Sequence, residues 1–330
     1  MIYRTLATLS LVASSVAATT YSSNPENLKY MWESFKRDFN KKYDTMSEEA
    51  SRYEAFIENL KVIDSRNALE KAVGGSAVHG ITQFSDMSQD EFSSRYLLSK
   101  PSMRSKNANV MTDIPTYTGP SGLVDWTGVL TTAVKNQGYC GSCWAFSATE
   151  QIESDSMRTL QTSYTLSPEQ ITQCDKTSYG CGGGWTEHAY DYVQKAGGIE
   201  TESDYPYTSY LGVTGTCSAD SSKFVIGVKG YTTINGESNM ASYVQSTGPL
   251  SVCVDASSWN SYTGGIMSSC GKRVDHCVQA VGVDARTGGF WKVRNSWGVS
   301  WGEAGYIRLS YGSNTCNIAS DPTWVSVFKV

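Results

Sequence analysis

Two cysteines stand three positions apart in the segment NQGYCGSCWAF, residues 136–146. Cys140 and Cys143 could form a redox pair, supply half of a zinc site, or have unrelated roles. The residues from Cys143 onward, CWAFSATEQIESDSMR, contain no Pro or Gly, and we expect them to form a helix. The free N–H groups at the start of that helix would favour a thiolate at Cys143.

The composition excludes several classes of protein. A chain of 330 residues that is 40% hydrophobic can bury one large or two ordinary cores. Its formal net charge of -5 offers no basic surface, so nucleic-acid binding is not expected. All nine cysteines follow residue 139, and an odd number in a secreted protein leaves at least one free thiol, which is a candidate nucleophile.

The N-terminus has the features of a secretory signal peptide. Arg4 is followed by an apolar stretch from Leu6 to about Val12 and then by small residues that end near Ala17. We therefore expect residues 1–17 to be removed in an oxidising compartment, where cysteines pair. No later segment reaches about 18 uninterrupted apolar residues, so we expect a soluble mature protein without a membrane anchor.

The segment before the first cysteine is charged and helical. In LKYMWESFKRDFNKKY the apolar residues recur at spacings of three and four, which predicts one buried stripe formed by Leu28, Trp32, Phe35 and Phe39. In EEASRYEAFIENLKVIDSRN a second helical face carries Glu48, Arg52, Phe56, Asn59, Ile63 and Asn67. Pro, Gly and Thr cluster at residues 111–122, which indicates a linker between two modules.

These motifs together resemble one protease family. The second helical face is similar to the E-R-F-N-I-N motif of cathepsin L-like papain-family propeptides, and GITQFSD (residues 80–86) resembles their G-x-N-x-F-x-D motif, with Thr82 in place of Asn. CGSCW fits the papain and cathepsin signature. His276 follows Cys143 by 133 residues, and Asn295 opens NSWGVSWGEAGY, another block typical of the family. The resemblance implies a signal peptide (1–17), an inhibitory propeptide (18–119) and a papain-like peptidase domain (120–330).

The resemblance also implies catalytic roles for Cys143, His276, Asn295 and Gln137. A Cys143 thiolate paired with a His276 imidazolium would attack the peptide carbonyl, and His276 would then protonate the leaving amine. Asn295 would orient the imidazole, with Trp297 shielding that hydrogen bond. Gln137 would donate a hydrogen bond to the developing oxyanion. The expected activity is that of a cysteine endopeptidase, which acts through a thioester and is made as an inactive zymogen.

The same resemblance implies three disulfides and a set of substrate-binding residues. The bridges are Cys140–Cys181, Cys174–Cys217 and Cys270–Cys316, which would leave Cys143 free. The candidates for substrate binding are Gly183, Gly184, Trp185, Thr186, Cys253, Asp275, Cys277, Trp297 and Asp321. Whether Cys253 and Cys277 form a fourth bridge is an open question. Asp321 could select Arg at P2 from the floor of the S2 pocket, or it could cap a turn before Pro322 and face solvent.

The expected fold is α+β, with a helical lobe that carries Cys143, a β-barrel lobe that carries His276 and Asn295, and a helical prosegment. The resemblance implies protein or peptide substrates, inhibition by the chain's own propeptide and by cystatin-like proteins, and a monomer without cofactor or metal. The expected location is the secretory pathway, ending in a lysosome, a vacuole or the extracellular space. No N-x-[ST] sequon is present to favour one of these.

Rival functions and roles remain to be tested. A zinc site lacks a second C-x-x-C or a pair of histidines, and a thioredoxin-like site lacks a preceding βαβ pattern. A thiol oxidoreductase, a catalytically inactive homologue and a peptide ligase would each differ in a thiol or product assay. For His79 we expect a solvated loop position rather than a pH-sensing one, and for His188 no functional role. Protonation of carboxylates such as Asp86 is expected to weaken propeptide docking at acid pH.

Overall fold

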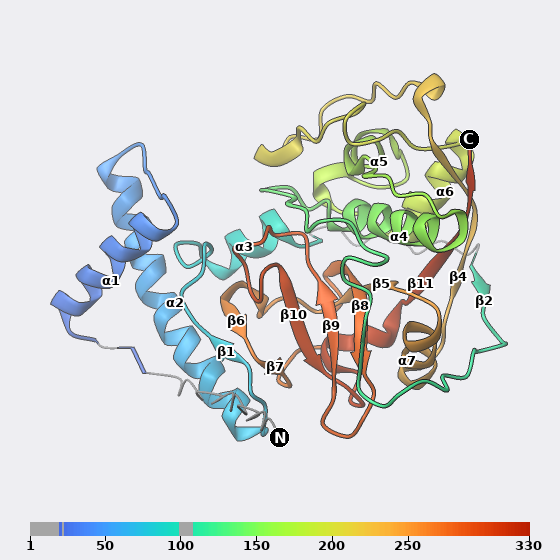
Figure 1. Ribbon diagram of the computed structural model, residues 1–330. Coiled ribbons are helices and arrows are strands. Elements are labelled where there is room, and N and C mark those ends of the chain that lie inside the picture. Colours follow the sequence, from blue (N-terminus) through green and yellow to red (C-terminus); the bar gives the residue numbers. More distant parts are fainter. Residues whose placement is uncertain (1–19, 22, 99–107) are drawn as a thin grey trace, which may run out of the picture.

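The computed structural model describes residues 20, 21, 23–98 and 108–330, and it consists of a helical prosegment and a two-lobed body (Figure 1). The expected signal peptide, residues 1–17, lies outside the described residues. In Figure 1 the blue and cyan prosegment helices lie to one side, the green and yellow helical lobe lies at the top, and the orange and red strands lie below it. The α+β architecture with a helical N-terminal segment agrees with the expected fold.

The prosegment has a small core of its own. Its elements are α1 (Pro25–Asp38), α2 (Met46–Ala72), β1 (Val78–His79) and α3 (Gln89–Tyr96). Trp32 and Phe35 from the predicted stripe are buried against Phe56, Leu60 and Ile63 of α2. The helices begin where capping side chains satisfy free N–H groups: Asn24 caps α1, Thr45 caps α2 and Ser88 caps α3.

The polar members of the second helical face hold the chain that follows α2. Arg52 binds Glu91 through two nitrogens and also donates to the carbonyl of Asp86. Asn59 Nδ2 donates to the carbonyls of Ser85 and Met87, at 2.8 and 2.7 Å. The face is therefore polar because it positions the backbone that leads to α3.

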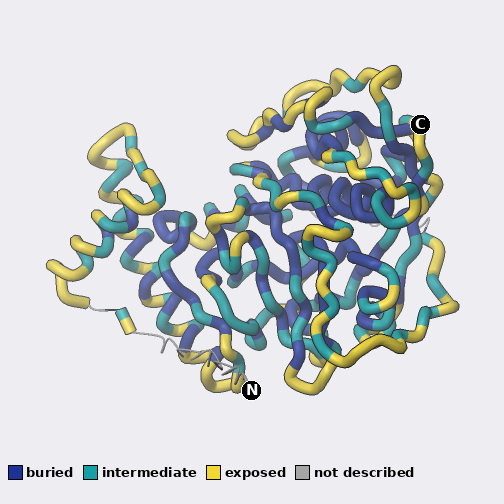
Figure 2. Tube along the Cα trace, viewed as in Figure 1, coloured by how far each residue is buried: buried dark blue, intermediate teal, exposed yellow. Residues whose placement is uncertain are grey.

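The helical lobe is built around α4 (Cys143–Leu160), which is buried along most of its length (Figure 2). Around it lie α5 (Pro168–Cys174), α6 (Thr186–Ala196) and three short 3₁₀ turns, Gly180–Gly182, Ser209–Leu211 and Ser221–Lys223. Ser167 caps α5 by accepting a hydrogen bond of 3.0 Å from the backbone N–H of Gln170. Gly197 ends α6 with a φ of 91°, a left-handed conformation that glycine adopts without strain.

The second lobe is a largely antiparallel sheet. The described strands in their order across it are β2 (Asn109–Val110), β4 (Ile226–Thr233), β11 (Thr323–Lys329), β5 (Leu250–Val254), β8 (His276–Asp284), β9 (Phe290–Arg294), β10 (Tyr306–Ser310) and β7 (Ile266–Met267), with β3 (Leu123–Asp125) paired to β8. Prosegment strand β1 pairs with β6 (Tyr262–Gly264). Helix α7 (Glu237–Ser246) and the 3₁₀ turns Trp259–Ser261 and Thr315–Ser320 complete this lobe.

The structure contains four disulfides, all within the body. Three are the pairs Cys140–Cys181, Cys174–Cys217 and Cys270–Cys316. The fourth joins Cys253 to Cys277, which stand opposite each other on β5 and β8. Cys143 is the one free cysteine of the nine, all of which are described.

One prosegment expectation is wrong, and a second remains a prediction. His79 does not lie in a solvated loop, since it is 3% exposed on β1 and its Nδ1 lies 2.9 Å from Ser261 Oγ in the body. The Asp86 carboxylate accepts hydrogen bonds of 2.9 Å from Lys41 and Tyr43, both within the prosegment. Its protonation would therefore act on docking through the packing of the prosegment, and the expected loss of docking at acid pH stays a prediction.

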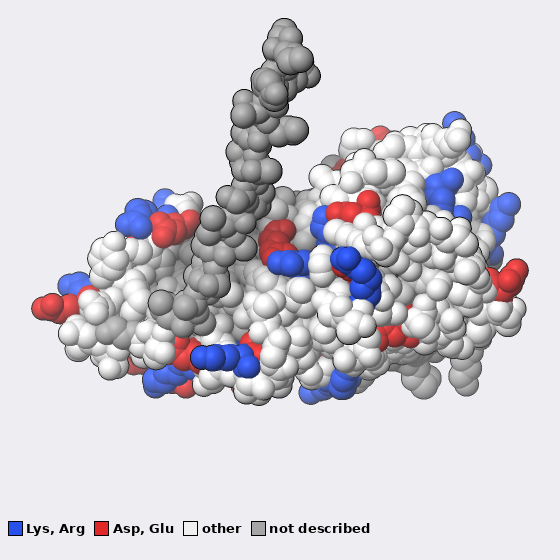
Figure 3. All heavy atoms as spheres, turned by 60° about the horizontal axis from the view of Figure 1, so that its bottom comes forward, with Lys and Arg blue, Asp and Glu red and all other residues white. Residues whose placement is uncertain are grey.

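The last two features of the fold concern the charged surface and the apolar character of the described helices. In the view of Figure 3, basic and acidic side chains lie in small groups of both signs. Within the described part of the chain, no helix combines the length and apolar character needed to cross a bilayer.

Candidate active site

Cys143 is the first residue of α4 and is fully buried in this structure. Burial raises the pKa of its thiol to about 12, although the backbone N–H groups of Cys277, Trp144 and Cys143 itself act in the opposite direction. The N–H groups at the helix start thus favour the thiolate, as predicted from the sequence. The hydrogen bond from the Cys277 N–H also shows that the thiol lies next to the residue that follows His276 on β8.

His276 and Asn295 come together from two neighbouring strands. His276 opens β8, Asn295 follows the last residue of β9, and the His276 Nε2 lies 2.8 Å from the Asn295 Oδ1. Trp297 is fully buried, and its ring centroid lies 4.8 Å from that of the imidazole, so it shields this hydrogen bond from solvent. The other imidazole nitrogen, Nδ1, has no hydrogen-bond partner among the described residues. It is therefore free to exchange a proton.

Burial favours the neutral forms of both side chains in this structure. It lowers the pKa of His276 to about 4, while the hydrogen bond to Asn295 raises it by a smaller amount. With the pKa of the Cys143 thiol raised to about 12, the favoured forms at pH 7 are a thiol and a neutral imidazole. The expected thiolate–imidazolium pair therefore requires a change in the surroundings of these two residues.

Gln137 precedes Cys143 by six residues and contacts the prosegment. Its Nε2 donates to the carbonyl of Cys140 at 2.8 Å and to the carbonyl of Tyr96 at 3.0 Å. Its Oε1 accepts a hydrogen bond of 2.7 Å from Ser296 Oγ, which fixes the orientation of the amide. A prosegment carbonyl oxygen thus occupies a donor suited to an oxyanion.

The chain after α3 also binds the other side of the site. The N–H of Leu98 donates to the carbonyl of Asp275 at 2.7 Å. Burial raises the pKa of the Asp275 carboxyl to about 7, against the N–H of Ala256, which lowers it. Tyr96 thus contacts Gln137, which precedes α4, and Leu98 contacts Asp275, which precedes β8. The prosegment chain therefore covers the site from both sides.

Further contacts anchor the prosegment to the second lobe. Arg66 donates to Asn260 Oδ1 and Ser261 Oγ at 2.5 and 2.7 Å. The carboxylate of Glu70 accepts from the backbone N–H groups of Ser268 and Ser269. The motifs in the sequence did not single out either of these two anchoring residues.

The remaining candidates for substrate binding form two groups. Gly183 has a φ of 116°, and a Cβ at Gly184 would lie 2.6 Å from Trp144, so both positions favour glycine. Trp185 belongs to the same buried cluster as Cys253 and Cys277, and the buried Thr186 opens α6 beside it.

Asp321 does not face solvent. It is 4% exposed, which overturns the alternative of an exposed turn cap before Pro322. The neighbouring Ser320 Oγ donates to the carbonyl of Cys253 at 3.2 Å, so the segment that carries Asp321 lies against β5.

Among the described residues, no group of three or more His, Cys, Asp or Glu side chains gathers as metal ligands would.

Two family models match the chain. Residues 121–326 match "Papain family cysteine protease", and residues 32–92 match "Cathepsin propeptide inhibitor domain (I29)". Cathepsin L 2 of Paramecium tetraurelia is 39% identical over 303 residues, which cover 89% of this chain and 91% of that protein. Digestive cysteine proteinase 1 of Homarus americanus is 38% identical, with 90% and 94% covered.

Solved precursors have the same fold. The digestive procathepsin L2 proteinase from the larval midgut of Tenebrio molitor superimposes with a TM-score of 0.81 at 29% identity, covering 91% of this chain and 99% of that chain. The recombinant stem bromelain precursor gives 0.76 at 30% identity, with 91% and 98% covered.

Proposed function

Since this chain belongs to the papain family of cysteine proteases and carries a cathepsin propeptide inhibitor domain, we propose that Cys143 is its nucleophile and His276 its general acid and base. The observation that carries this proposal is the hydrogen bond between His276 and Asn295 beside the one free thiol. It orients an imidazole whose other nitrogen is free to accept the thiol proton.

The reaction proceeds in two acyl-transfer steps. The Cys143 sulfur attacks the carbonyl carbon of the scissile bond, and the oxyanion accepts hydrogen bonds from Gln137 Nε2 and the Cys143 N–H. The C–N bond then breaks as His276 gives its proton to the leaving amine, which leaves a thioester. Water, deprotonated by His276, attacks the thioester, and the carboxylic acid leaves as the thiolate re-forms.

The prosegment keeps the enzyme inactive by occupying this machinery. The Tyr96 carbonyl uses the Gln137 donor, and Leu98 uses the Asp275 carbonyl. Burial under this segment supports the neutral forms of Cys143 and His276. We place the propeptide at residues 18–119 and the enzyme at residues 120–330, with cleavage between 113 and 122, where most of the chain is exposed.

The substrates are extended peptides held between the lobes. The backbone of Gly183 and Gly184 would pair with the substrate main chain. Trp185, Thr186 and the Cys253–Cys277 pair would line the S2 pocket, with Asp321 as an acidic floor that accepts Arg. Cystatin-like inhibitors would enter the same cleft. Four disulfides support a route through an oxidising compartment to a vacuole or to the exterior.

Alkylation and peptide hydrolysis test the proposal together. The full chain is expressed, part of it is activated at acid pH, and both forms are treated with iodoacetamide at pH 6. The activated enzyme is expected to lose activity quickly through modification of Cys143, whereas the zymogen should react slowly because its thiol is protonated. Cys143→Ala should abolish peptide hydrolysis. Activity retained in Cys143→Ala, or reaction at another cysteine, would refute the assignment.

A further inference from the structure

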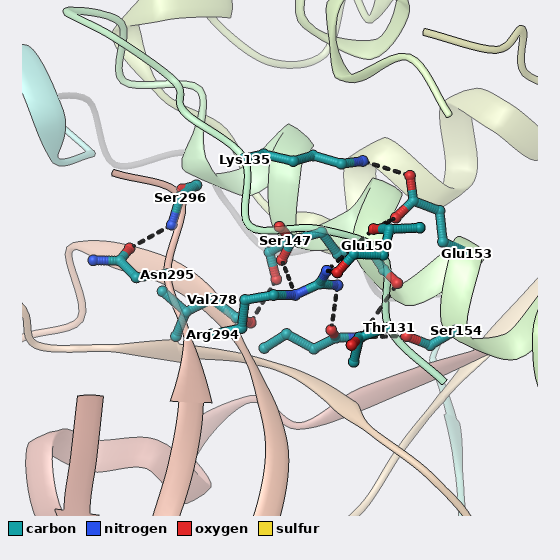
Figure 4. Close-up of polar contacts among 12 residues, drawn as sticks. Thr131, Lys135, Ser147, Glu150, Glu153, Ser154, Val278, Arg294, Asn295 and Ser296 are labelled. Carbon is teal, nitrogen blue, oxygen red and sulfur yellow. Dashed lines mark hydrogen bonds and ion pairs between the residues drawn. The ribbon is translucent and has the colours of Figure 1, made fainter. Parts of the chain in front are cut away.

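A buried arginine lies directly before the orienting asparagine, at the boundary between the two lobes (Figure 4). Arg294 ends β9 and is 0% exposed. Its Nη1 donates to the carbonyl of Thr132 at 2.8 Å, and its Nε lies 3.4 Å from the Glu150 Oε2 on α4. The strand that carries Asn295 is thus tied to the helix that carries Cys143.

Gln279 completes the connection from the neighbouring strand. It stands opposite Arg294 in the β8–β9 register, three residues after His276, and its Oε1 accepts a 2.6 Å hydrogen bond from the Arg294 Nη2. Its Nε2 lies within hydrogen-bonding distance of three α4 acceptors, the Glu150 carbonyl, the Gln151 Oε1 and the Ser154 Oγ. One amide therefore links β8 and β9 to α4.

Opposite charges surround this link. Glu153 on α4 binds Lys135 and accepts a hydrogen bond from Thr132 Oγ1, on the same chain segment that receives Arg294. Glu150 and Glu153 face Arg294 and Lys135, so two acidic and two basic groups meet in a region where only the Lys135 side chain reaches solvent, at 12% exposed. Removing one member leaves a buried charge without compensation, which makes the arrangement sensitive to substitution.

We propose that Arg294, joined to α4 through Gln279, is a positioning residue that fixes the strands of His276 and Asn295 relative to Cys143. The connection is made on one side by the residue next to Asn295, and on the other by residues in the third and fourth turns of the helix that begins at Cys143. The nucleophile and the base belong to different lobes, so their separation depends on how these lobes are held together. A displacement of about 1 Å between reacting groups can lower a rate by about 100-fold.

The test compares two arginines that both pair with carboxylates of α4. Arg294→Met and Arg294→Lys are made in the full chain, with Gln279→Met as an independent break in the link. Arg158→Met is the matched control, because Arg158 pairs with Asp155 further along α4, away from His276 and Asn295. After activation, kcat, KM and thermal unfolding are measured, together with the rate of Cys143 alkylation by iodoacetamide from pH 4 to pH 9.

Arg294→Met and Gln279→Met are expected to lower kcat by about 10- to 100-fold with KM within about twofold, and to shift the pH profile of alkylation. Arg294→Lys should recover part of the loss, and Arg158→Met should lower the unfolding temperature while keeping the wild-type profile. The inference is refuted if Gln279→Met and Arg294→Met both keep the wild-type kcat and alkylation profile. It rests on the proposed function, whose own test is hydrolysis by the wild type and its loss in Cys143→Ala.

Discussion

The carbonyl oxygen of Tyr96 accepts a hydrogen bond of 3.0 Å from the Nε2 of Gln137. The prosegment thereby uses the same donor that the proposed oxyanion would need. Inhibition and catalysis compete for one amide, so a change at Gln137 should affect both.

Gln137→Ala is expected to lower kcat of the activated enzyme by about 100-fold, because an oxyanion donor is lost. The same change should weaken inhibition by added prosegment by about fivefold, because one hydrogen bond is lost. Both are measured with a fluorogenic peptide. Gln83→Ala is the control, because Gln83 belongs to the prosegment, where it binds the Trp297 carbonyl and Ser300 Oγ, and it is removed on activation. Mature enzyme from this variant should keep its kcat, and a normal kcat in Gln137→Ala would contradict the assignment.

Activation should be faster at pH 4.5 than at pH 7.5, and His79 should contribute to the difference. Burial first, and Arg66 second, lower the pKa of docked His79 to about 3. Because the released imidazole titrates near 6.5, docking loses stability as the pH falls from about 6.5 towards 3. At pH 4.5 this loss is about 3 kcal/mol. His79→Gln should therefore reduce the ratio of activation rates at the two pH values by about 10- to 100-fold.

Glu70 is the matched control for the effect of pH. Burial raises the pKa of its carboxyl, against the N–H groups of Ser269 and Ser268, so its contribution to docking is retained at low pH and lost as the pH rises. Glu70→Gln should therefore leave the ratio of rates equal or larger. Equal cleavage of the wild type between residues 113 and 122 at both pH values would contradict the acid-gated mechanism, and an unchanged ratio in His79→Gln would exclude His79 from it.

Thiol counting checks the pairing of Cys253 with Cys277. The enzyme is unfolded without reductant and treated with a chromogenic disulfide reagent. We expect one reactive thiol, that of Cys143, because the other eight cysteines are bridged. Three reactive thiols would mean that the fourth bridge does not form in solution.

Asp321 is expected to favour Arg at P2. Its loss removes a charge-assisted hydrogen bond, so Asp321→Ala should lower kcat/KM for an Arg-Arg substrate by about 10-fold or more relative to a Phe-Arg substrate. Asp321→Asn removes the charge with little change of shape and should also lower kcat/KM for the Arg-Arg substrate relative to the Phe-Arg substrate. If the ratio of the two kcat/KM values is the same in the wild type and both variants, Asp321 does not select P2.

Local patterns predicted the elements, and long-range contacts decided what the patterns left open. The stripe of Trp32 and Phe35 and the helix from Cys143 depend on residues close in sequence, and both are present. His79 is buried against Ser261, which is 182 positions away in the sequence, so the residues adjacent to His79 in the chain could not predict its burial.

Two features near the site could not be predicted from the types of the residues that form them. The Tyr96 contact uses a backbone carbonyl, which every residue has, so only the path of the chain reveals it. Arg294 reads as one polar residue within an alternating strand. Its burial becomes visible only when Gln279 and Glu150 are placed beside it.

All four disulfides join cysteines between residues 140 and 316, so none links the prosegment to the enzyme. Before cleavage, the tether through residues 108–122 holds the inhibitor at a high effective concentration, and dilution cannot release it. A single cut there turns the contact into an ordinary bimolecular equilibrium. From that point inhibition depends on how much free prosegment surrounds the enzyme, so a crowded compartment should delay full activity after the cut, and dilution should hasten it.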